Sequence, residues 1–486
     1  MIAHRLLEEP LWRAEDLGKP IPGCQHAVSV ALPRWQDVVD YEEHKPEVID
    51  RLEGGYPRFV VPRLVRQLAR HIEPDLFCLP FPSESVARQA AAFVKRQTGG
   101  ICRFKEKSGV VGVITSPEGA AALQSFWQHT GWIVSSRRAE ACLENAGPNT
   151  AGAAYRQELT ERLAGFYDCA PDDVFLTPTG MAAHSLAWQV VSERRPNAAT
   201  AQLGFPYVDT LKLQQKIGHG ATLLHCLDTI EADLTSLMTR QALAACFCEI
   251  PGNPLLGSAD IRQVTPILRS RGVPLVVDDV VATPVNLDLR AHADLVVTSL
   301  TKFIAGTCDV MGGAVVCNPS SPYAAELKAG LRRFHEELLW DGDAAVLALQ
   351  ARVFPERMEQ HNRNGLIIAE RLRAHPQVEA VWYPKWCFNE AYESVRRPDG
   401  GWGALITFLP RHAPSRAPRV FDRLRVTKGP SLGTIFTIAC PFTLLAHYCE
   451  LEWAESCGVS RYLIRLSIGL EDPEDMWRRI CQALEN

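Results

Sequence analysis

Two apolar segments that each end in polar side chains constrain the fold of this chain more than any other feature. Residues 275–278 run from leucine and valines into Asp278, and residues 293–299 end in Ser299, three residues before Lys302. Such runs are typical of buried parallel strands. Ligands of open α/β sheets bind beyond the carboxyl ends of the strands. We therefore expect an acid, hydroxyls and an amine to meet in one crevice.

This set of side chains is the one that pyridoxal phosphate requires. A lysine amine binds the cofactor covalently, a carboxylate pairs with the pyridinium nitrogen, and hydroxyls hold the phosphate. Lys302, Asp278, Ser299 and Thr301 supply these groups within 25 residues. The sequence therefore predicts pyridoxal 5'-phosphate as the cofactor, with Lys302 as its anchor.

Size and charge narrow the class of protein. A chain of 486 residues is too long for one small domain, and its 47% hydrophobic and 22% charged content is ordinary for a globular protein. The net charge is −5 and no basic block stands out, which argues against nucleic-acid or membrane-surface partners. The first residues lack the apolar core of a signal peptide, and no run reaches the roughly 18 apolar residues of a membrane span.

The fifteen cysteines form neither a CxxC pair nor a cysteine–histidine grid, so the sequence predicts no metal site and no disulfide framework. Cys246 and Cys248 alternate on a predicted strand, as reduced core residues would. These features favour a reducing compartment, and we expect a cytoplasmic protein.

The segment from Ser299 to Gly313 resembles the lysine segment of the cystathionine γ-synthase family of pyridoxal-phosphate enzymes. Residues 277–284 resemble that family's pyridinium-binding strand, with Asp279 where asparagine is usual. The strand and turn ending in Thr179-Gly180-Met181 resemble its phosphate cradle. The first amides of a helix that begins there would bind an anion.

The resemblance also assigns roles to the remaining site residues. Tyr207, in Gly-Phe-Pro-Tyr-Val-Asp-Thr, would stack on the cofactor ring and help to move protons. Asn253 would hydrogen-bond the phenolic oxygen of the cofactor, with Glu249 supporting it. Ser431 would line the substrate side. Arg465 lies alone among apolar neighbours, where a charge is costly unless it is paired, and it would clamp the substrate carboxylate.

The N-terminal region resembles an extended subgroup of the family that is found in fungi and some bacteria. In the family, a Tyr-x-Arg pair from the neighbouring subunit reaches the cofactor phosphate. Tyr56-Pro57-Arg58 has this pattern, but it lies 122 residues before Gly180. Ser135-Ser136-Arg137 is nearer and lacks the tyrosine. We favour Arg137 and keep Tyr56–Arg58 as the alternative.

The fold implied by this resemblance is the type I fold of pyridoxal-phosphate-dependent transferases, in the α/β class. We expect an extended N-terminal region (1–150), a large cofactor-binding domain with a mostly parallel, seven-stranded type of sheet (151–330) and a smaller α+β domain (331–486). Residues 325–372 are expected to be helical, with an interruption near Pro355. Family active sites are shared between subunits, so a homodimer or homotetramer is expected.

The resemblance implies γ-substitution on an O-acylhomoserine, with Lys302 as the base and cysteine as the nucleophile. The alternatives are γ-elimination, a different donor or acceptor in specialised metabolism, and a fold that has become a binding module. Asp279, Cys308 and Thr434 depart from the family pattern and leave the acceptor open. Retention of Lys302, Asp278 and Arg465 together argues against a binding module.

Overall fold

A seven-stranded mixed sheet forms the centre of the computed structural model, which describes residues 2–147 and 150–485. Four of its six strand pairings are parallel, and the two that involve β12 are antiparallel. This confirms the predicted α/β class and the mostly parallel sheet. The strands, in spatial order, are β6 (Val174–Thr177), β12 (Gly313–Cys317), β11 (Leu295–Ser299), β10 (Leu275–Asp278), β9 (Leu243–Glu249), β7 (Ala199–Leu203) and β8 (Ala221–Leu224).

Both faces of this sheet are buried, which explains its nearly continuous apolar strands. Leu275 and Val277 of β10 belong to one hydrophobic core, and Val276 between them belongs to the other. The first core is covered by α8, α11 and α12, and the second by α9 and α14. The bounds are α8 (Gly152–Phe166), α9 (Gly180–Arg194), α11 (Ile230–Arg240), α12 (Ile261–Arg269) and α14 (Ala324–Phe334).

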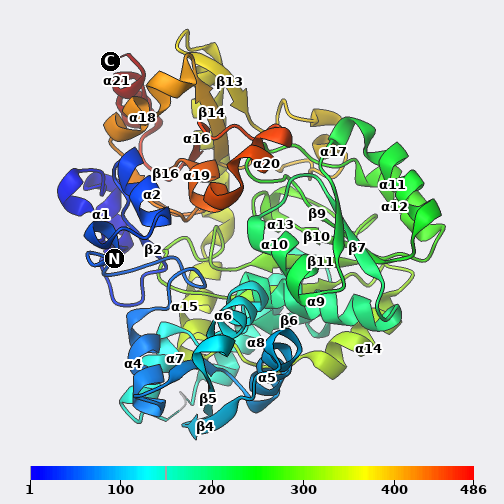
Figure 1. The fold of residues 1–486 in the computed structure, drawn as a ribbon. Helices are drawn as coiled ribbons and strands as arrows, with labels where there is room; N and C mark the ends of the chain where they lie inside the picture. The colour runs from blue at the N-terminus through cyan, green and yellow to red at the C-terminus, as the bar shows by residue number, and fades with distance from the viewer. Residues whose placement is uncertain (1, 148–149, 486) are drawn as a thin grey trace.

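A second sheet of five strands lies in the C-terminal part of the chain (Figure 1). Its pairings are antiparallel except that β15 runs parallel to β16. In order, its strands are β13 (Val378–Trp382), β14 (Leu405–Pro410), β17 (Ile464–Ser467), β16 (Ile438–Cys440) and β15 (Thr427–Lys428). Its helices are α17 (Asn389–Glu393), α18 (Ala413–Arg423), α19 (Phe442–His447), α20 (Leu451–Ser456) and α21 (Pro473–Glu485).

The helical stretch expected over 325–372 is broken twice rather than once. After α14 the chain becomes extended at His335 and resumes as α15 (Asp341–Ala351) and α16 (Phe354–Ala374). Pro355 lies in the first turn of α16, where proline lacks no hydrogen bond, so it begins a helix instead of interrupting one.

The N-terminal region divides into two parts, which meet where Gln25 and His26 are hydrogen-bonded to Glu140 and Ser136. The first part packs beside the C-terminal sheet, where α2 contacts α18 and α19. The second part forms its own three-stranded antiparallel sheet at the opposite end. Their elements are α1 (Ile2–Glu8), β1 (Pro20–Ile21), β2 (Ser29–Val30), α2 (Trp35–Glu42), α3 (Pro46–Ile49), α4 (Arg63–Ile72), β3 (Phe77–Phe81), α5 (Glu84–Thr98), β4 (Arg103–Lys107), β5 (Val110–Thr115), α6 (Pro117–Thr130) and α7 (Ser136–Leu143).

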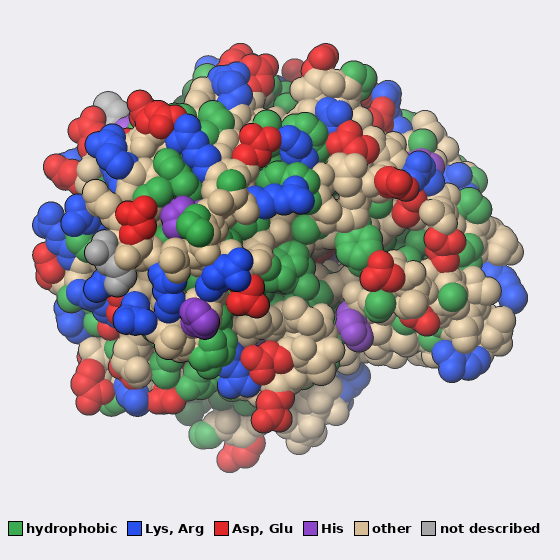
Figure 2. Space-filling model, turned by 90° about the horizontal axis from the view of Figure 1, so that it is seen from above, with side chains coloured by type: hydrophobic (Ala, Val, Ile, Leu, Met, Phe, Trp, Pro, Cys, Tyr) green, Lys and Arg blue, Asp and Glu red, His purple; other side chains and the backbone are tan. Residues whose placement is uncertain are grey.

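Each of the three predicted ranges thus contains whole sheets, although the boundaries at 150 and 330 stay predictions. Across the described parts of the chain, no helix is both long and apolar enough to cross a membrane. On the face drawn in Figure 2, basic and acidic side chains are interspersed rather than gathered by sign.

Candidate active site

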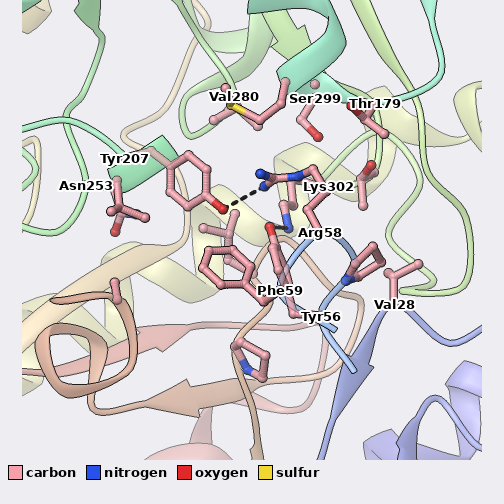
Figure 3. Close-up of a pocket in the computed structure, with 18 of the residues that line it drawn as sticks. Val28, Tyr56, Arg58, Phe59, Thr179, Tyr207, Asn253, Val280, Ser299 and Lys302 are labelled. Atoms are coloured by element: carbon pink, nitrogen blue, oxygen red, sulfur yellow. Dashed lines mark hydrogen bonds between the residues drawn. The ribbon is translucent and has the colours of Figure 1, made fainter. Parts of the chain in front are cut away.

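Lys302 lies in a pocket at the carboxyl ends of β10 and β11 (Figure 3). Its side chain is buried, and its Nζ donates a hydrogen bond to the Tyr56 hydroxyl at 2.8 Å. The Ser431 hydroxyl lies 3.5 Å from the same nitrogen. The lysine amine therefore faces the cavity, held between two hydroxyls that come from distant parts of the chain.

Asp278 reaches the same pocket from the end of β10. Its Oδ2 is hydrogen-bonded to Nε2 of His184 at 2.7 Å, and its Oδ1 accepts a bond from the Val280 amide at 2.8 Å. Asp278 pairs in parallel register with Glu249 of β9. Burial, together with the charge of Asp278, raises the pKa of Glu249 to about 8. His184 thus fixes the orientation of the Asp278 carboxyl group in the pocket.

Glu249 holds two of the predicted cofactor contacts in place. Its carboxyl oxygens accept hydrogen bonds from the Tyr207 amide at 2.6 Å and from the Asn253 amide at 3.3 Å. Tyr207 and Asn253 both line the pocket, on the same side of Lys302 in the view of Figure 3. The supporting role expected for Glu249 has a direct geometric basis.

The start of α9 forms a close-fitting cradle. Thr179 caps the helix, accepting a hydrogen bond from the Ala182 amide at 3.0 Å. A Cβ atom added to Gly180 would lie 2.6 Å from Cβ of Ser299, so only glycine fits there. Met181 and Thr301 line the same pocket. A helix N-terminus beside hydroxyls is suited to binding a phosphate.

Arg465 of β17 is a buried cation without a counter-charge. It is 3% exposed, and its guanidinium donates to the carbonyl oxygens of Ser431 at 2.9 Å and Pro430 at 3.1 Å. Its other terminal nitrogen lies 3.4 Å from Oδ1 of Asn253. No carboxylate of the residues described here forms a salt bridge with it. An unpaired buried guanidinium that lines a pocket is suited to a carboxylate ligand.

The segment Tyr56–Phe59 forms another wall of the pocket. Arg58 is 6% exposed and donates hydrogen bonds to the Tyr207 hydroxyl at 2.7 Å and to the carboxylate of Asp209. Burial raises the pKa of Tyr56, but the charges of Lys302 and Arg58 outweigh it and hold that pKa below its usual value. Tyr56 is therefore poised beside the lysine amine.

Arg137, which we favoured as the phosphate ligand, does not line this pocket. Its guanidinium is bound by Asp309 at 3.2 Å and by Asp343 at 3.3 Å. Within the chain, Tyr56–Arg58 lines the pocket and Arg137 does not, and the choice between them as the phosphate ligand stays a prediction. The residues between them fold into the three-stranded sheet, so separation along the chain does not measure distance from the pocket.

Three further residues at the site carried no clear signal in the sequence. His184 lies one helical turn after Gly180 on α9, and its contact with Asp278 follows only from the fold. Asp209, two residues after Tyr207, is fully buried. Glu42, at the end of α2, lines the pocket and has no hydrogen-bond or ion partner among the residues described. Burial raises its pKa to about 8.

The donor set fits pyridoxal phosphate. The pocket presents a lysine amine, a carboxylate oriented by His184, and a helix N-terminus where any added Cβ would fill the space. When the cofactor binds, Lys302 would hold it covalently, Asp278 would face its ring nitrogen and the start of α9 would hold its phosphate. Ser299, Thr301, Tyr207 and Asn253 complete this proposed set.

Comparisons with known proteins agree with this chemistry. Residues 151–485 match the family described as Cys/Met metabolism PLP-dependent enzyme, and residues 60–135 match the fungal trans-sulfuration enzyme N-terminal domain. The chain is 31% identical to a cystathionine γ-synthase of Neurospora crassa, in an alignment that covers 97% of this chain and 98% of that protein. It is 35% identical to an L-2-amino-4-chloropent-4-enoate dechlorinase/desaturase of Streptantibioticus cattleyicolor, covering 94% and 95%.

Among solved structures, a cystathionine γ-synthase of Xanthomonas oryzae pv. oryzae in complex with cystathionine superposes with a TM-score of 0.61. The match covers 68% of this chain and 85% of that one, at 26% identity. Together with the geometry of the pocket, these matches establish that the chain belongs to the pyridoxal-phosphate-dependent Cys/Met metabolism enzyme family.

Proposed function

We propose that this protein catalyses γ-substitution on an O-acylated homoserine, with the thiol of cysteine as the nucleophile. The observation that carries the proposal is the meeting of Lys302, Asp278 and the unpaired Arg465 in one pocket. These groups are suited to an amino acid that reacts through its α-amine. The similarity to cystathionine γ-synthases of Neurospora crassa and Xanthomonas oryzae supports the choice of reaction.

Bound pyridoxal phosphate would supply an acceptor for the electron pair that remains when a proton leaves the α-carbon. The chain supplies the rest. The Nζ of Lys302, in its uncharged form, would take the α-proton, and after that proton has been passed on it would take one from the β-carbon. Tyr56, 2.8 Å from this nitrogen and with its pKa lowered, orients the amine and can share the proton.

Arg465 fixes the orientation of the substrate. A substrate carboxylate that accepts hydrogen bonds from the terminal N–H groups of its guanidinium would form charge-assisted bonds in a buried site. Ser431, whose hydroxyl faces Lys302 and whose carbonyl holds Arg465, connects the base with the carboxylate clamp. Asp278, whose Oδ2 is held by Nε2 of His184 at 2.7 Å, would present its carboxyl group to the cofactor ring.

The pocket favours an uncharged acyl group on the donor. Its lining is largely apolar, it includes the acids Glu42, Glu249 and Asp278, and its cation Arg58 is already paired with Asp209. An acetyl group can lie against such a surface. A succinyl group would bring a second carboxylate into a pocket that contains acids such as Glu42. We therefore infer that O-acetylhomoserine is used in preference to O-succinylhomoserine.

A second candidate is γ-elimination, or γ-substitution with another donor and acceptor. Its support is the 35% identity to the dechlorinase/desaturase of Streptantibioticus cattleyicolor. The three departures from the family pattern, Asp279, Cys308 and Thr434, do not support this second candidate. Asp279 is bound by the Tyr167 hydroxyl at 2.9 Å, Cys308 is buried, and Thr434 donates to the Phe436 carbonyl at 2.5 Å, all outside the pocket.

Turnover in deuterium oxide tests the class of reaction. Expulsion of a γ-substituent requires removal of a β-proton, so product formed from O-acetylhomoserine should carry deuterium at both Cα and Cβ by mass spectrometry and NMR. Exchange confined to Cα would contradict γ-chemistry. It would instead resemble an enzyme such as the alanine racemase of Aspergillus violaceofuscus, which is 27% identical to this chain.

We also propose that the protein works as a homodimer or homotetramer in the cytoplasm. All fifteen cysteines lie in the described part of the chain and carry free thiols, as a reducing compartment would maintain them. Sedimentation analysis of the purified protein would determine its oligomeric state.

A further inference from the structure

We propose that Asp279 binds a proton behind the cofactor site, as a buried carboxylic acid, and so leaves Asp278 as the carboxylate that faces the cofactor ring. Asp278 is the last residue of β10, and Asp279 follows it directly. In the family that the sequence resembles, asparagine is usual at the second position. This inference rests on the proposed role of Asp278 and is independent of the donor and the acceptor.

Asp279 faces away from the cofactor pocket. Asp278 lines that pocket, whereas Asp279 lines a second, smaller cavity together with Tyr167 and Asn318. This arrangement follows from the alternation of side chains along an extended segment. Asp279 is 0% exposed within a single chain. The contacts of its carboxyl group therefore do not depend on how subunits assemble.

The Asp279 carboxyl group has too few partners for a buried charge. Its Oδ2 accepts a hydrogen bond from the Tyr167 hydroxyl at 2.9 Å. Its Oδ1 is buried and has no hydrogen-bond partner in the described part of the chain, where no cation forms a salt bridge with Asp279 either. Asp278, by contrast, is bound by His184 at 2.7 Å and by the Val280 amide at 2.8 Å. A buried carboxylate without a cation is costly, whereas a carboxylic acid needs only an acceptor for its proton.

Carboxyl groups at the same edge of the sheet oppose a further negative charge at Asp279. Burial, followed by the charge of Asp278, raises the pKa of Asp279 to about 7, although the hydroxyls of Thr298 and Tyr167 lower it. Glu249 of β9 lies beside Asp278 in parallel register, and burial and the same charge raise its pKa to about 8. Among neighbouring carboxyl groups, each ionisation opposes the next. The proton therefore resides on Asp279, while Asp278 has the partners that suit a charge.

The cations around the second cavity do not neutralise Asp279. Arg290 and Arg397 line this cavity, but each is paired with another carboxylate. The Arg290 guanidinium lies 2.6 Å from the carboxylate of Asp288, and that of Arg397 lies 3.0 Å from the carboxylate of Asp168. These pairs occupy both guanidinium groups, so the cavity supplies no counter-charge for an ionised Asp279.

The second cavity can provide the acceptor that the proton needs. It has a volume of about 20 Å³, which is room for one water molecule. Its lining extends from Asp279 to the exposed side chain of Arg290. Neutral Asp279 would donate from Oδ1 to a water molecule there. On ionisation the O–H bond breaks, its electron pair stays on the carboxylate, and the proton passes to solvent water. Asp279 is thus a positioning residue that acts through the charge of Asp278.

Infrared difference spectroscopy of the purified protein with its cofactor tests this inference. A neutral carboxyl group has a C=O stretching band that is separate from the carboxylate bands and shifts in deuterium oxide. The spectrum of wild type minus that of Asp279→Asn should contain one such band at pH 6 and lose it by pH 9. Glu249 and the other acids contribute to both spectra and cancel. Absence of the band at pH 6 would overturn the inference.

Thermal unfolding as a function of pH gives an independent measure. A carboxyl group whose pKa is raised by folding destabilises the protein as the pH rises from its unfolded value, about 3.9, to its folded value. For Asp279 the folded value is about 7. The melting temperature of Asp279→Asn should therefore rise relative to that of wild type between pH 5 and pH 7, and then stay level. Equal pH dependence in the two proteins would contradict a proton on Asp279.

Asp288→Asn provides a matched control, because Asp288 lines the same cavity. Its hydrogen bonds with Arg290 lower its pKa to about 2, so it is charged throughout this pH range. Its melting temperature relative to wild type should not change between pH 5 and pH 7. A change equal to that of Asp279→Asn would assign the effect to the cavity as a whole and overturn the inference.

Two further variants test the partners of Asp279 and keep the inference testable if Asp279→Asn does not fold. Tyr167→Phe removes the donor that favours the charged form, so the infrared band should persist to higher pH. Asp278→Asn removes the charge that opposes ionisation, so the band should disappear at lower pH. An unchanged titration in both variants would overturn the link between the two acids. Failure of the proposed γ-substitution would leave these spectra unaffected, so the two proposals can fail separately.

Discussion

The pocket has two halves that differ in how the chain builds them. One half comes from the ends of neighbouring strands and from the start of α9, and it contains Asp278, Lys302 and Gly180. The other half, formed by Glu42, Tyr56 and Arg58, comes from the N-terminal extension and reaches the pocket only through tertiary contacts. The first half contains the groups predicted to bind the cofactor, and the second half surrounds them. Tyr56 and Arg58 match the family's Tyr-x-Arg pattern, so we expect a difference in donor or acceptor to depend on Glu42.

Replacement of Lys302 should have the largest effect, because it removes both the covalent anchor and the proposed base. Lys302→Ala should lower the turnover of O-acetylhomoserine by roughly a thousandfold or more and abolish the borohydride-fixed adduct. Lys212→Ala, which removes a half-buried lysine that is paired with Glu450 and does not line the pocket, is the control. Survival of the adduct in Lys302→Ala would show that another lysine binds the cofactor.

Arg465→Ala should have the second-largest effect on activity. Truncating one partner of a buried charge pair costs about 3 kcal/mol, so kcat/KM for the amino-acid donor should fall roughly a hundredfold, mainly through KM. Arg461→Ala, four residues earlier and paired with Glu455, should change it little. An unchanged KM in Arg465→Ala would remove its role as the carboxylate clamp.

Asp209→Asn tests whether the second half depends on its buried ion pair. Loss of the carboxylate charge should loosen Arg58 and weaken cofactor binding about tenfold, measured by titrating apoprotein with pyridoxal phosphate. Asp343→Asn removes the equivalent partner of Arg137 and should leave that affinity unchanged. Equal weakening in the two variants would mean that the effect is a general loss of stability.

The smallest effect is expected at Glu42. Its pKa of about 8 follows from burial, so raising the pH from 7 to 9 should charge it. The charged form repels a succinyl carboxylate, so preference for O-acetylhomoserine over O-succinylhomoserine should increase a few-fold over this range. The ratio of the kcat/KM values for the two donors measures this preference. Groups of the enzyme whose titration affects both donors equally do not change this ratio. Glu42→Gln should show a ratio that does not change with pH.

The sequence was most informative where local pattern and position in the sheet coincide. Apolar runs ending in Asp278 and Ser299 predicted two buried strands and the crevice beyond them, and the structure has both strands. Arg465 was recognisable as one charge in an apolar strand, and it is buried there with no salt bridge to any carboxylate of the described residues.

The second half of the pocket could not be predicted in this way. Arg58 lies in a turn with a left-handed backbone, and its partners are 70 and 151 residues away. Distance along the chain favoured Arg137, because the three-stranded sheet that separates the two arginines was not recognised as a unit. Contacts of this kind depend on how whole helices and strands pack together, so the periodicity of the sequence does not predict them.

The most direct test of the account is product analysis with O-acetylhomoserine, with and without cysteine. We predict cystathionine by mass spectrometry only when cysteine is present, and its loss in the Lys302→Ala protein. Oxobutyrate in equal amounts in both reactions would contradict γ-substitution and establish γ-elimination. A second contrary result would be a protein that carries the cofactor on Lys302 and turns over neither O-acetylhomoserine nor O-succinylhomoserine. That result would contradict the assignment of an O-acylhomoserine as substrate.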